Sequence, residues 1–217
     1  MDNYCSSDNS AVLRPHAAQY MFLDSRGRDA GQENMRIEPR PGGWLAVSRL
    51  ELTGPDALTC DIEWHLEDDL STHVLYMAGT DHWGEEFTLE AAVTGNGLLA
   101  SRTGPDGPTQ VEMGWGPDVE LDHISACFTT VLLARWDTAT VPRRELTTVY
   151  IAAEDLVPEP LDQVYRVTAR DPATTVTTIE RVAPVTGSSA MIRLGQGGLV
   201  LGYEGLFRIA DNWSFIT

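Results

Sequence analysis

Four residues of types that bind metal ions or transfer protons lie within the segment MAGTDHWGEEF, residues 77–87: Asp81, His82, Glu85 and Glu86. On a tight turn such side chains diverge, and the segment lacks the closely spaced histidine pairs of common metal sites. Neighbouring residues in a strand also point to opposite faces, which separates a carboxylate from an adjacent imidazole. We therefore predict no metal site here, but a hairpin turn in which Trp83 packs inward and the acidic side chains face water or the mouth of a cavity.

Acid–base chemistry has a second candidate in the neighbouring residues Asp122 and His123. His123 opens a segment that we expect to be a buried helix, so it is the histidine expected to face the interior, whereas His65 falls on the wet side of its strand. We predict His123 as a catalytic residue, together with Asp81 and Tyr165. A hydrogen-bonded structural role for His123 is the alternative.

Covalent catalysis and nucleotide cofactors have little support. The sequence contains no Gly-x-Ser-x-Gly motif, and Cys60 and Cys127 lie outside recognisable nucleophile motifs. The glycine-rich stretch GQGGLVLG at 195–202 lacks both a following helix and the Lys-Ser/Thr pair of a phosphate-binding loop. We expect no cofactor.

Ligand binding by aromatic and polar side chains is the remaining chemistry, since aromatic rings line ligand cavities as well as ordinary cores. Several such side chains fall on positions that we expect to face the interior, and some polar ones could anchor a ligand. The predicted ligand-binding residues are Trp64, Tyr76, Trp83, Trp115, Phe128, Leu132, Arg135, Gln163 and Tyr203. Plain core packing of the aromatic residues is the alternative.

The elements that must position these residues are mostly strands, because apolar and polar residues alternate along much of the chain. The clearest case is ALTCDIEWHLED at 57–68, and EFTLEAAV at 86–93 repeats the pattern. Such alternation favours an antiparallel sheet with one solvated face. Turn signals such as RPGG at 40–43 and GPDG at 104–107 separate the runs. Further strands are predicted at 44–52, 72–78, 146–152, 163–169, 174–182, 189–194 and 199–209.

One stretch, PDVELDHISACFTTVLLARWD at 117–137, has helical periodicity instead, with apolar residues at positions 121, 124, 128, 131, 132 and 136. We predict a helix near 121–136, with Asp118 as a possible N-terminal cap. The helix is apolar nearly all round, so protein should surround it. A buried strand at 128–134 is the alternative, because Thr129, Thr130 and Val131 are β-branched. The predicted fold is mainly β: a long curved antiparallel sheet, roll-like or barrel-like, wrapped around a single helix.

Composition sets limits on partners and location. The 217 residues carry 32 acidic and 15 basic side chains, a formal net charge of −17, which disfavours nucleic acids and anionic membranes. The first residues do not resemble a signal peptide, and no apolar run approaches the length of a membrane span. We expect a cytoplasmic protein with a flexible N-terminal arm over 1–17 and one domain over 18–217. An exposed sheet edge could pair two copies into a homodimer.

Four segments resemble stretches of the putative glycolipid-binding family of bacterial proteins, and they occur in the same order: DHW at 81–83, DVELDH at 118–123, DQVYRV at 162–167 and GGLVLGYEGLFRIA at 197–210. The resemblance implies a spiral β-roll around one helix, and it implies binding of a glycolipid.

This chain departs from the family pattern at several positions. The family's run Thr-Asn-Thr-Leu-Pro-Ile-Arg-Arg corresponds here to FTTVLLARW, which keeps Arg135 but loses one arginine. Glu85 and Glu86 stand where the family has an arginine after the tryptophan, and Glu204 replaces a proline. A guanidinium supplies several fixed hydrogen-bond donors, so loss of arginines fits a less polar ligand.

The predicted function is binding of a hydrophobic or amphipathic small molecule, such as a lipid, glycolipid or polyketide, in an apolar cavity between sheet and helix. A second hypothesis is a cofactor-independent cyclase or isomerase that folds a natural-product intermediate into a reactive conformation. A third is a structural or interaction module with a solid core.

Overall fold

The structure is a computed structural model that describes residues 13–54, 57–81, 83–152, 157–210 and 214–215. Their elements, in chain order, are β1 (His16–Leu23), β2 (Asp29–Arg40), β3 (Gly43–Leu52), β4 (Leu58–Leu66), β5 (Thr72–Thr80), β6 (Glu86–Thr94), β7 (Gly97–Gly104), β8 (Gly107–Gly114), β9 (Val119–Asp122), α1 (Ala126–Ala134), β10 (Arg143–Ile151), β11 (Pro158–Asp171), β12 (Val176–Ala183), β13 (Ser188–Leu194), the short 3-10 helix η2 (Gln196–Gly198), β14 (Val200–Tyr203), β15 (Phe207–Ile209) and β16 (Ser214–Phe215).

All of these strands belong to one sheet. Its order is β8-β7-β6-β5-β4-β3-β2-β1-β15-β14-β13-β12-β11-β10-β9, with β16 paired to β1. Neighbours are antiparallel except for β9 and β10, which run parallel. The pairing of β1 with β15 joins the two ends of the chain in the middle of the sheet. The two sheet edges, β8 and β9, are therefore consecutive strands in the sequence.

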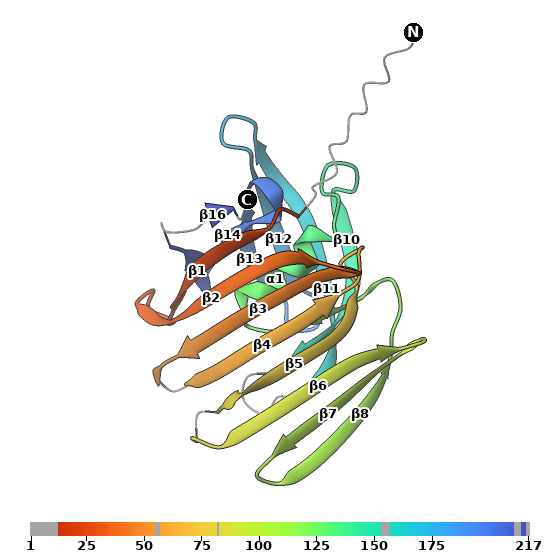
Figure 1. The fold of residues 1–217 in the computed structure, drawn as a ribbon. Helices are drawn as coiled ribbons and strands as arrows, with labels where there is room; N and C mark the ends of the chain where they lie inside the picture. Colours follow the sequence, from red (N-terminus) through yellow and green to blue (C-terminus); the bar gives the residue numbers. More distant parts are fainter. Residues whose placement is uncertain (1–12, 55–56, 82, 153–156, 211–213, 216–217) are drawn as a thin grey trace.

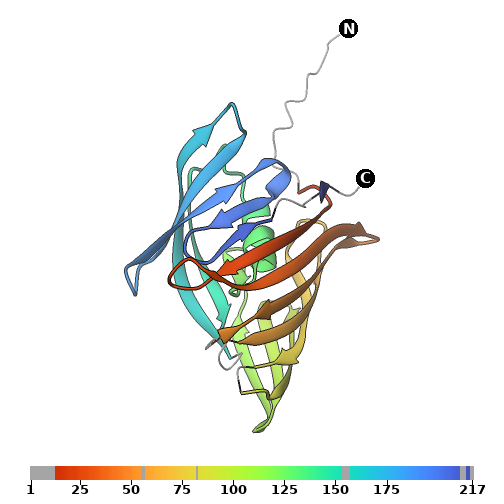
Figure 2. The same cartoon turned by 90° about the vertical axis from the view of Figure 1, so that its left-hand side faces the viewer.

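The sheet curls around α1, as predicted. Figure 1 shows β1–β8 as a twisted layer in front of the helix, with β10–β14 behind it. Figure 2 looks along the roll, and α1 lies between the two halves of the sheet. Every residue of α1 is buried, so the prediction of a helix surrounded by protein is confirmed and the alternative strand at 128–134 is wrong.

The helix begins later than predicted, and its cap differs. Val119–Asp122 form β9, so Asp118 as the cap is wrong. The N-cap is Ser125, whose hydroxyl accepts the backbone N–H of Cys127 at 3.1 Å. The acidic stretch before the helix pairs with β10 instead, which shortens α1 to Ala126–Ala134.

A buried carboxylate from a distant strand completes this cap. Glu33 in β2 is fully buried and accepts the backbone N–H groups of Ala126 at 2.7 Å and Cys127 at 3.2 Å. It also accepts the hydroxyls of Ser125 at 2.6 Å and Ser48 at 2.5 Å. The first turn of a helix has unpaired N–H groups and partial positive charge, so an acidic acceptor is stabilising there. Burial raises the pKa of Glu33, and these hydrogen bonds oppose that shift.

The core lies between the sheet and α1. The apolar series predicted in β4 is buried at each position, from Leu58 to Leu66, while the residues between them are more exposed. Trp64 packs on Phe128 of the helix with ring centroids 4.7 Å apart. A continuous cluster of buried side chains includes both residues and Leu132. Core packing therefore accounts for much of the predicted aromatic set.

Two predicted boundaries differ from the structure. The predicted strand at 199–209 is wrong as one element, because a turn at Glu204–Leu206, with Gly205 at φ +73°, divides it into β14 and β15. At the other end, the predicted arm over 1–17 falls mostly outside the described residues. Leu13 is buried and β1 begins at His16, so the first strand includes two residues that the prediction assigned to the arm.

Candidate functional site

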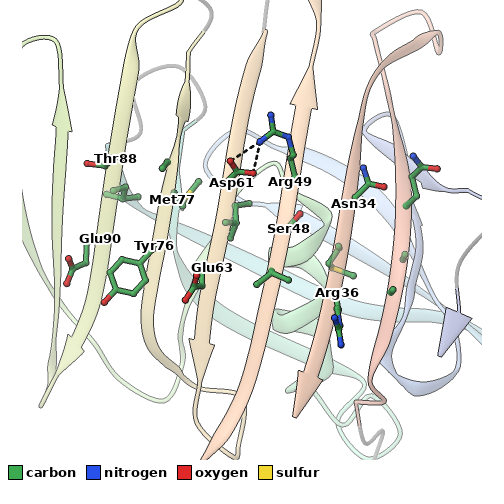
Figure 3. A pocket seen from close by; sticks show the side chains of 18 of the residues that line it. Asn34, Arg36, Ser48, Arg49, Asp61, Glu63, Tyr76, Met77, Thr88 and Glu90 are labelled. Carbon is green, nitrogen blue, oxygen red and sulfur yellow. Dashed lines mark hydrogen bonds and ion pairs between the residues drawn. The ribbon is translucent and has the colours of Figure 1, made fainter. Parts of the chain in front are cut away.

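A pocket of about 900 Å³ lies on the face of β1–β7 that points away from α1. Figure 3 views this face, with the helix behind the sheet. We call the pocket the outer trough. Its outward-facing lining residues are Ala17, Gln19, Asn34, Arg36, Val47, Arg49, Asp61, Glu63, Tyr76, Ala78, Thr88, Glu90, Ser101 and Thr103.

Strand alternation explains how these side chains reach one surface. In β4, Ile62 is buried against the core, while Asp61 and Glu63 on either side of it are exposed. The short side chains of Val47 and Ala78 leave space between longer neighbours, because Val47 lies in register with Arg36 and Glu63, and Ala78 lies in register with Asp61 and Thr88. The trough is thus the predicted wet face of the sheet, hollowed by its own small residues.

Tyr76 is the large apolar group of the trough, and 42% of its surface is exposed. Its register partners on the two neighbouring strands are Glu63 of β4 and Glu90 of β6. Figure 3 shows the ring between these two carboxylates. His65 meets the ring edge-on, with centroids 6.3 Å apart, and its Nε2 lies 2.7 Å from Glu63 Oε1. An aromatic face between two acceptors suits a ligand with an apolar ring face and hydroxyl or ammonium donors.

The other half of the trough holds an ion-pair network centred on Arg49. Its Nη1 donates to both carboxylate oxygens of Asp61 at 2.8 Å, and its Nε donates to Glu51 at 2.8 Å. Hydrogen bonding to Glu51, followed by Asp61, raises the pKa of Arg49. The same contact lowers the pKa of Glu51. Both groups therefore stay charged near neutral pH, and Glu51 helps to hold the guanidinium of Arg49, which lines the trough.

The lining of the trough is net acidic. Three carboxylates, on Asp61, Glu63 and Glu90, face two guanidinium groups, on Arg36 and Arg49. Arg36 is itself paired with Glu38, outside the lining. This balance disfavours anionic head groups and suits neutral or cationic ones.

Comparison with known proteins agrees with this fold. Residues 25–209 match the family described as "Putative glycolipid-binding". The chain belongs to this family. The resemblance predicted from four short segments is thereby confirmed over most of the sequence, and a search among curated proteins finds no match.

Two solved structures have a fold similar to that of this chain. A DUF1089 family protein from Pseudomonas aeruginosa has a TM-score of 0.59 and 20% identity, with 83% of this chain and 92% of that chain covered. A beta-barrel-like protein of DUF1849 from Brucella abortus has a TM-score of 0.58 and 11% identity, with 94% and 99% covered. At these identities the likeness concerns the fold alone.

The tight turn at residues 81–85 lies at the rim of the sheet, between β5 and β6. Asp81 Oδ1 accepts the backbone N–H groups of Trp83 and Glu85, each at 2.9 Å. This turn leaves Trp83 70% exposed, so the prediction that Trp83 packs inward is wrong. Glu85 and Glu86 are exposed, as expected. His82 lies outside the described residues.

Tyr76 was predicted to face the space between sheet and helix, and this is also wrong, because it points away from α1 into the trough. The other residues predicted to bind a ligand lie in or beside the core. Trp64, Phe128 and Leu132 are core residues, whereas Trp115 and Tyr203 are partly buried against it.

The interior brings some of the predicted catalytic and binding residues together. Gln163 Nε2 donates to Asp122 at 2.8 Å, and Gln163 Oε1 accepts from Tyr165 at 2.5 Å and from Arg181 at 2.9 Å. Burial raises the pKa of Asp122. His123 Nδ1 accepts the backbone N–H of Ser125 at 3.2 Å, which fits the alternative of a structural histidine.

Arg135, the arginine that this chain keeps from the family run, lies at the C-terminus of α1. Its guanidinium pairs with the buried carboxylate of Glu120 in β9, which also pairs with Arg144 of β10 at 3.0 Å. The guanidinium is itself mostly buried. Arg135 thus ties the helix end to the last strands of the sheet, on the opposite side of the sheet from the trough.

Sequence reasoning missed most of the trough residues, including Arg49, Asp61, Glu63 and Glu90. Their signal is present as the polar members of alternating strands, but only strand register shows that they are neighbours.

Metal binding has no structural support: no group of three or more His, Cys, Asp or Glu side chains could hold an ion among the residues the structure describes. None of the described helices is long and apolar enough to cross a membrane.

Proposed function

We propose that this chain binds a neutral amphipathic small molecule whose hydroxyl-rich head group lies in the outer trough. The observation that carries the proposal is the exposed ring of Tyr76 between the carboxylates of Glu63 and Glu90, inside a pocket of about 900 Å³. A sugar ring has a face of C–H groups that can pack on an aromatic ring, and its hydroxyls donate to carboxylates.

Family membership supports a ligand of this kind, since the family is described as glycolipid-binding. The charges of the trough narrow the choice of head group. Carboxylates outnumber guanidinium groups in the lining, and Arg49 is already engaged by Asp61 and Glu51. A phosphate or sulfate head group would have to displace these partners, so an uncharged sugar is favoured.

The proposed site is therefore on the outer face rather than in the apolar cavity first predicted between sheet and helix. All residues of α1 are buried, and Trp64 of β4 packs directly on Phe128 of the helix, which supports this choice. In the described part of the chain, no observation favours the cyclase or the interaction module over binding. A homodimer through the edge strands β8 or β9 stays a prediction.

Calorimetric titration of the purified chain with octyl glucoside tests the proposal. Tyr76→Ala should weaken binding about two- to twelvefold, because an aromatic contact contributes about 0.5–1.5 kcal/mol beyond burial. Trp83→Ala, which removes another exposed aromatic side chain outside the trough, should leave the affinity unchanged. Octyl sulfate, with the same tail and an anionic head, should bind equally well to the wild type and to Tyr76→Ala, because its head group is not expected in the trough. Equal affinities of the wild type and Tyr76→Ala for octyl glucoside, or an equal loss of octyl sulfate affinity in Tyr76→Ala, would refute the proposal.

A further inference from the structure

A second pocket, of about 450 Å³, lies beside the turn between β1 and β2. We call it the end pocket. Its floor is apolar and comes from four separate parts of the chain: Phe22 of β1, Leu52 of β3, Ile124 before α1 and Leu206 between β14 and β15. Phe22 and Leu52 are buried, and the other two pack against the core from its edge. The end pocket therefore reaches the edge of the core, and Ile124 and Leu206 are its partly exposed apolar side chains.

The rim of the end pocket is the turn between β1 and β2. Asp24 Oδ1 accepts the backbone N–H groups of Arg26 at 2.8 Å and Arg28 at 2.9 Å, and Oδ2 accepts Arg28 Nε at 2.8 Å. The single acidic side chain of the lining is thus held in the turn and neutralised by Arg28. The guanidinium of Arg26 has no hydrogen-bond or ion-pair partner among the described residues. A free cation at the rim of an apolar pocket stands out in a chain of net charge −17.

We propose that the end pocket binds a single-chain anionic amphiphile of the medium-chain fatty carboxylate class. The alkyl chain would cover Phe22, Leu52, Ile124 and Leu206, and the carboxylate would lie at the guanidinium of Arg26. Cationic amphiphiles would meet Arg26 with like charge, and a polar solute would leave the apolar floor wet. This site is separate from the outer trough, so it stands or falls independently of the function proposed above.

The size of the end pocket sets the length of chain it can hold. Its volume of about 450 Å³ equals roughly fifteen times the volume that one water molecule occupies in the liquid. A chain of about ten carbons fits that space. Each methylene moved from water into the pocket should tighten binding about fourfold, so decanoate, with two more methylenes, should bind about sixteenfold more tightly than octanoate.

Methyl NMR of the isoleucine-labelled protein tests the proposal, because Ile124 lies in the floor. Titration with decanoate should shift the Ile124 methyl signal to saturation and leave Ile179, in β12 on the far part of the sheet, unchanged. Decyltrimethylammonium, with the same chain and a positive head, should bind at least fivefold more weakly. Saturable shifts elsewhere without a shift at Ile124, or equal binding of the two amphiphiles, would overturn the proposal.

Variants separate the contributions of head and tail. Arg26→Gln keeps the backbone N–H that Asp24 accepts and removes only the cation, so decanoate should bind about two- to fivefold more weakly. Arg143→Gln, which removes an exposed cation in β10, is the matched control and should bind normally. Leu206→Asn should weaken decanoate about tenfold by placing an amide in the floor. Unchanged decanoate affinity in Arg26→Gln would overturn the role of Arg26, and this surface variant does not depend on the folding of Leu206→Asn. Octyl glucoside binding to both variants should match the wild type, which distinguishes failure of this site from failure of the trough.

Discussion

The most informative single change is Glu33→Ala, because this side chain joins β2, β3 and the start of α1. The variant leaves the backbone N–H of Ala126 buried without an acceptor, which costs about 1–3 kcal/mol. It also removes negative charge from the helix N-terminus, at about 1–2 kcal/mol in a buried setting. Burial raises the pKa of Glu33, so relief of the buried charge offsets part of this loss. We expect a net destabilisation of about 2–4 kcal/mol.

Urea unfolding, followed by tryptophan fluorescence and circular dichroism, measures this loss directly. For a chain of this length, each kcal/mol lowers the melting temperature by about 2–4 °C, so Glu33→Ala should melt about 5–15 °C below the wild type. Glu90→Ala, the same change on the exposed face of β6, should stay within about 0.5 kcal/mol of the wild type. If the two variants were equally stable, the Glu33 carboxylate would not be what holds the start of the helix.

The remaining predictions concern pH, packing and an ion pair. Burial lowers the pKa of His123 to about 3, below its unfolded value of 6.5. Folding therefore favours the neutral imidazole, and the stability of the protein falls as the pH drops from 6.5 toward 3. Between pH 7 and pH 5, the wild type should lose about 2 kcal/mol more unfolding free energy than His123→Gln, and equal losses in urea titrations would contradict this. A Cβ at Gly79 would lie 1.8 Å from a backbone oxygen of β4, so Gly79→Ala should cost about 3 kcal/mol in the same assay, whereas Gly114→Ala, with open space around it, should cost far less. Arg135→Ala should destabilise by about 1–3 kcal/mol because it leaves Glu120 buried with one partner fewer, and a loss below 0.5 kcal/mol would show that the pair is not stabilising.

Local patterning was enough to predict the class of fold. Alternation in ALTCDIEWHLED required one dry face and one wet face, and each apolar residue from Leu58 to Leu66 is buried in β4. The run ACFTTVLLA has no polar face to present to water, so a helix there had to be enclosed, as α1 is. These inferences depend only on which residues follow one another, and that information is complete in the sequence.

Tertiary structure decided the features that depend on partners distant in the chain. The start of α1 could not be located from its own segment, because the carboxylate that caps it comes from Glu33, which lies 93 residues before Ala126. Trp83 was misplaced because the direction of its side chain depends on the backbone of the turn, which Asp81 holds. The boundaries of the helix could not be predicted from the β-branched residues and the acidic stretch before it. The parallel pairing of β9 with β10 assigns the acidic stretch to the sheet and so sets where the helix can begin.

The trough shows the same division most clearly. The alternation of β4 and β6 assigned Glu63 and Glu90 to the wet faces of their strands from the sequence alone, whereas Tyr76 was expected at an interior cavity. Only the register of β4, β5 and β6 made them neighbours, since a shift of one residue would turn a whole strand over. A binding surface needs suitable residue types and suitable distances between them. The sequence specifies the residue types directly, whereas the pairing of strands across the sheet sets the distances.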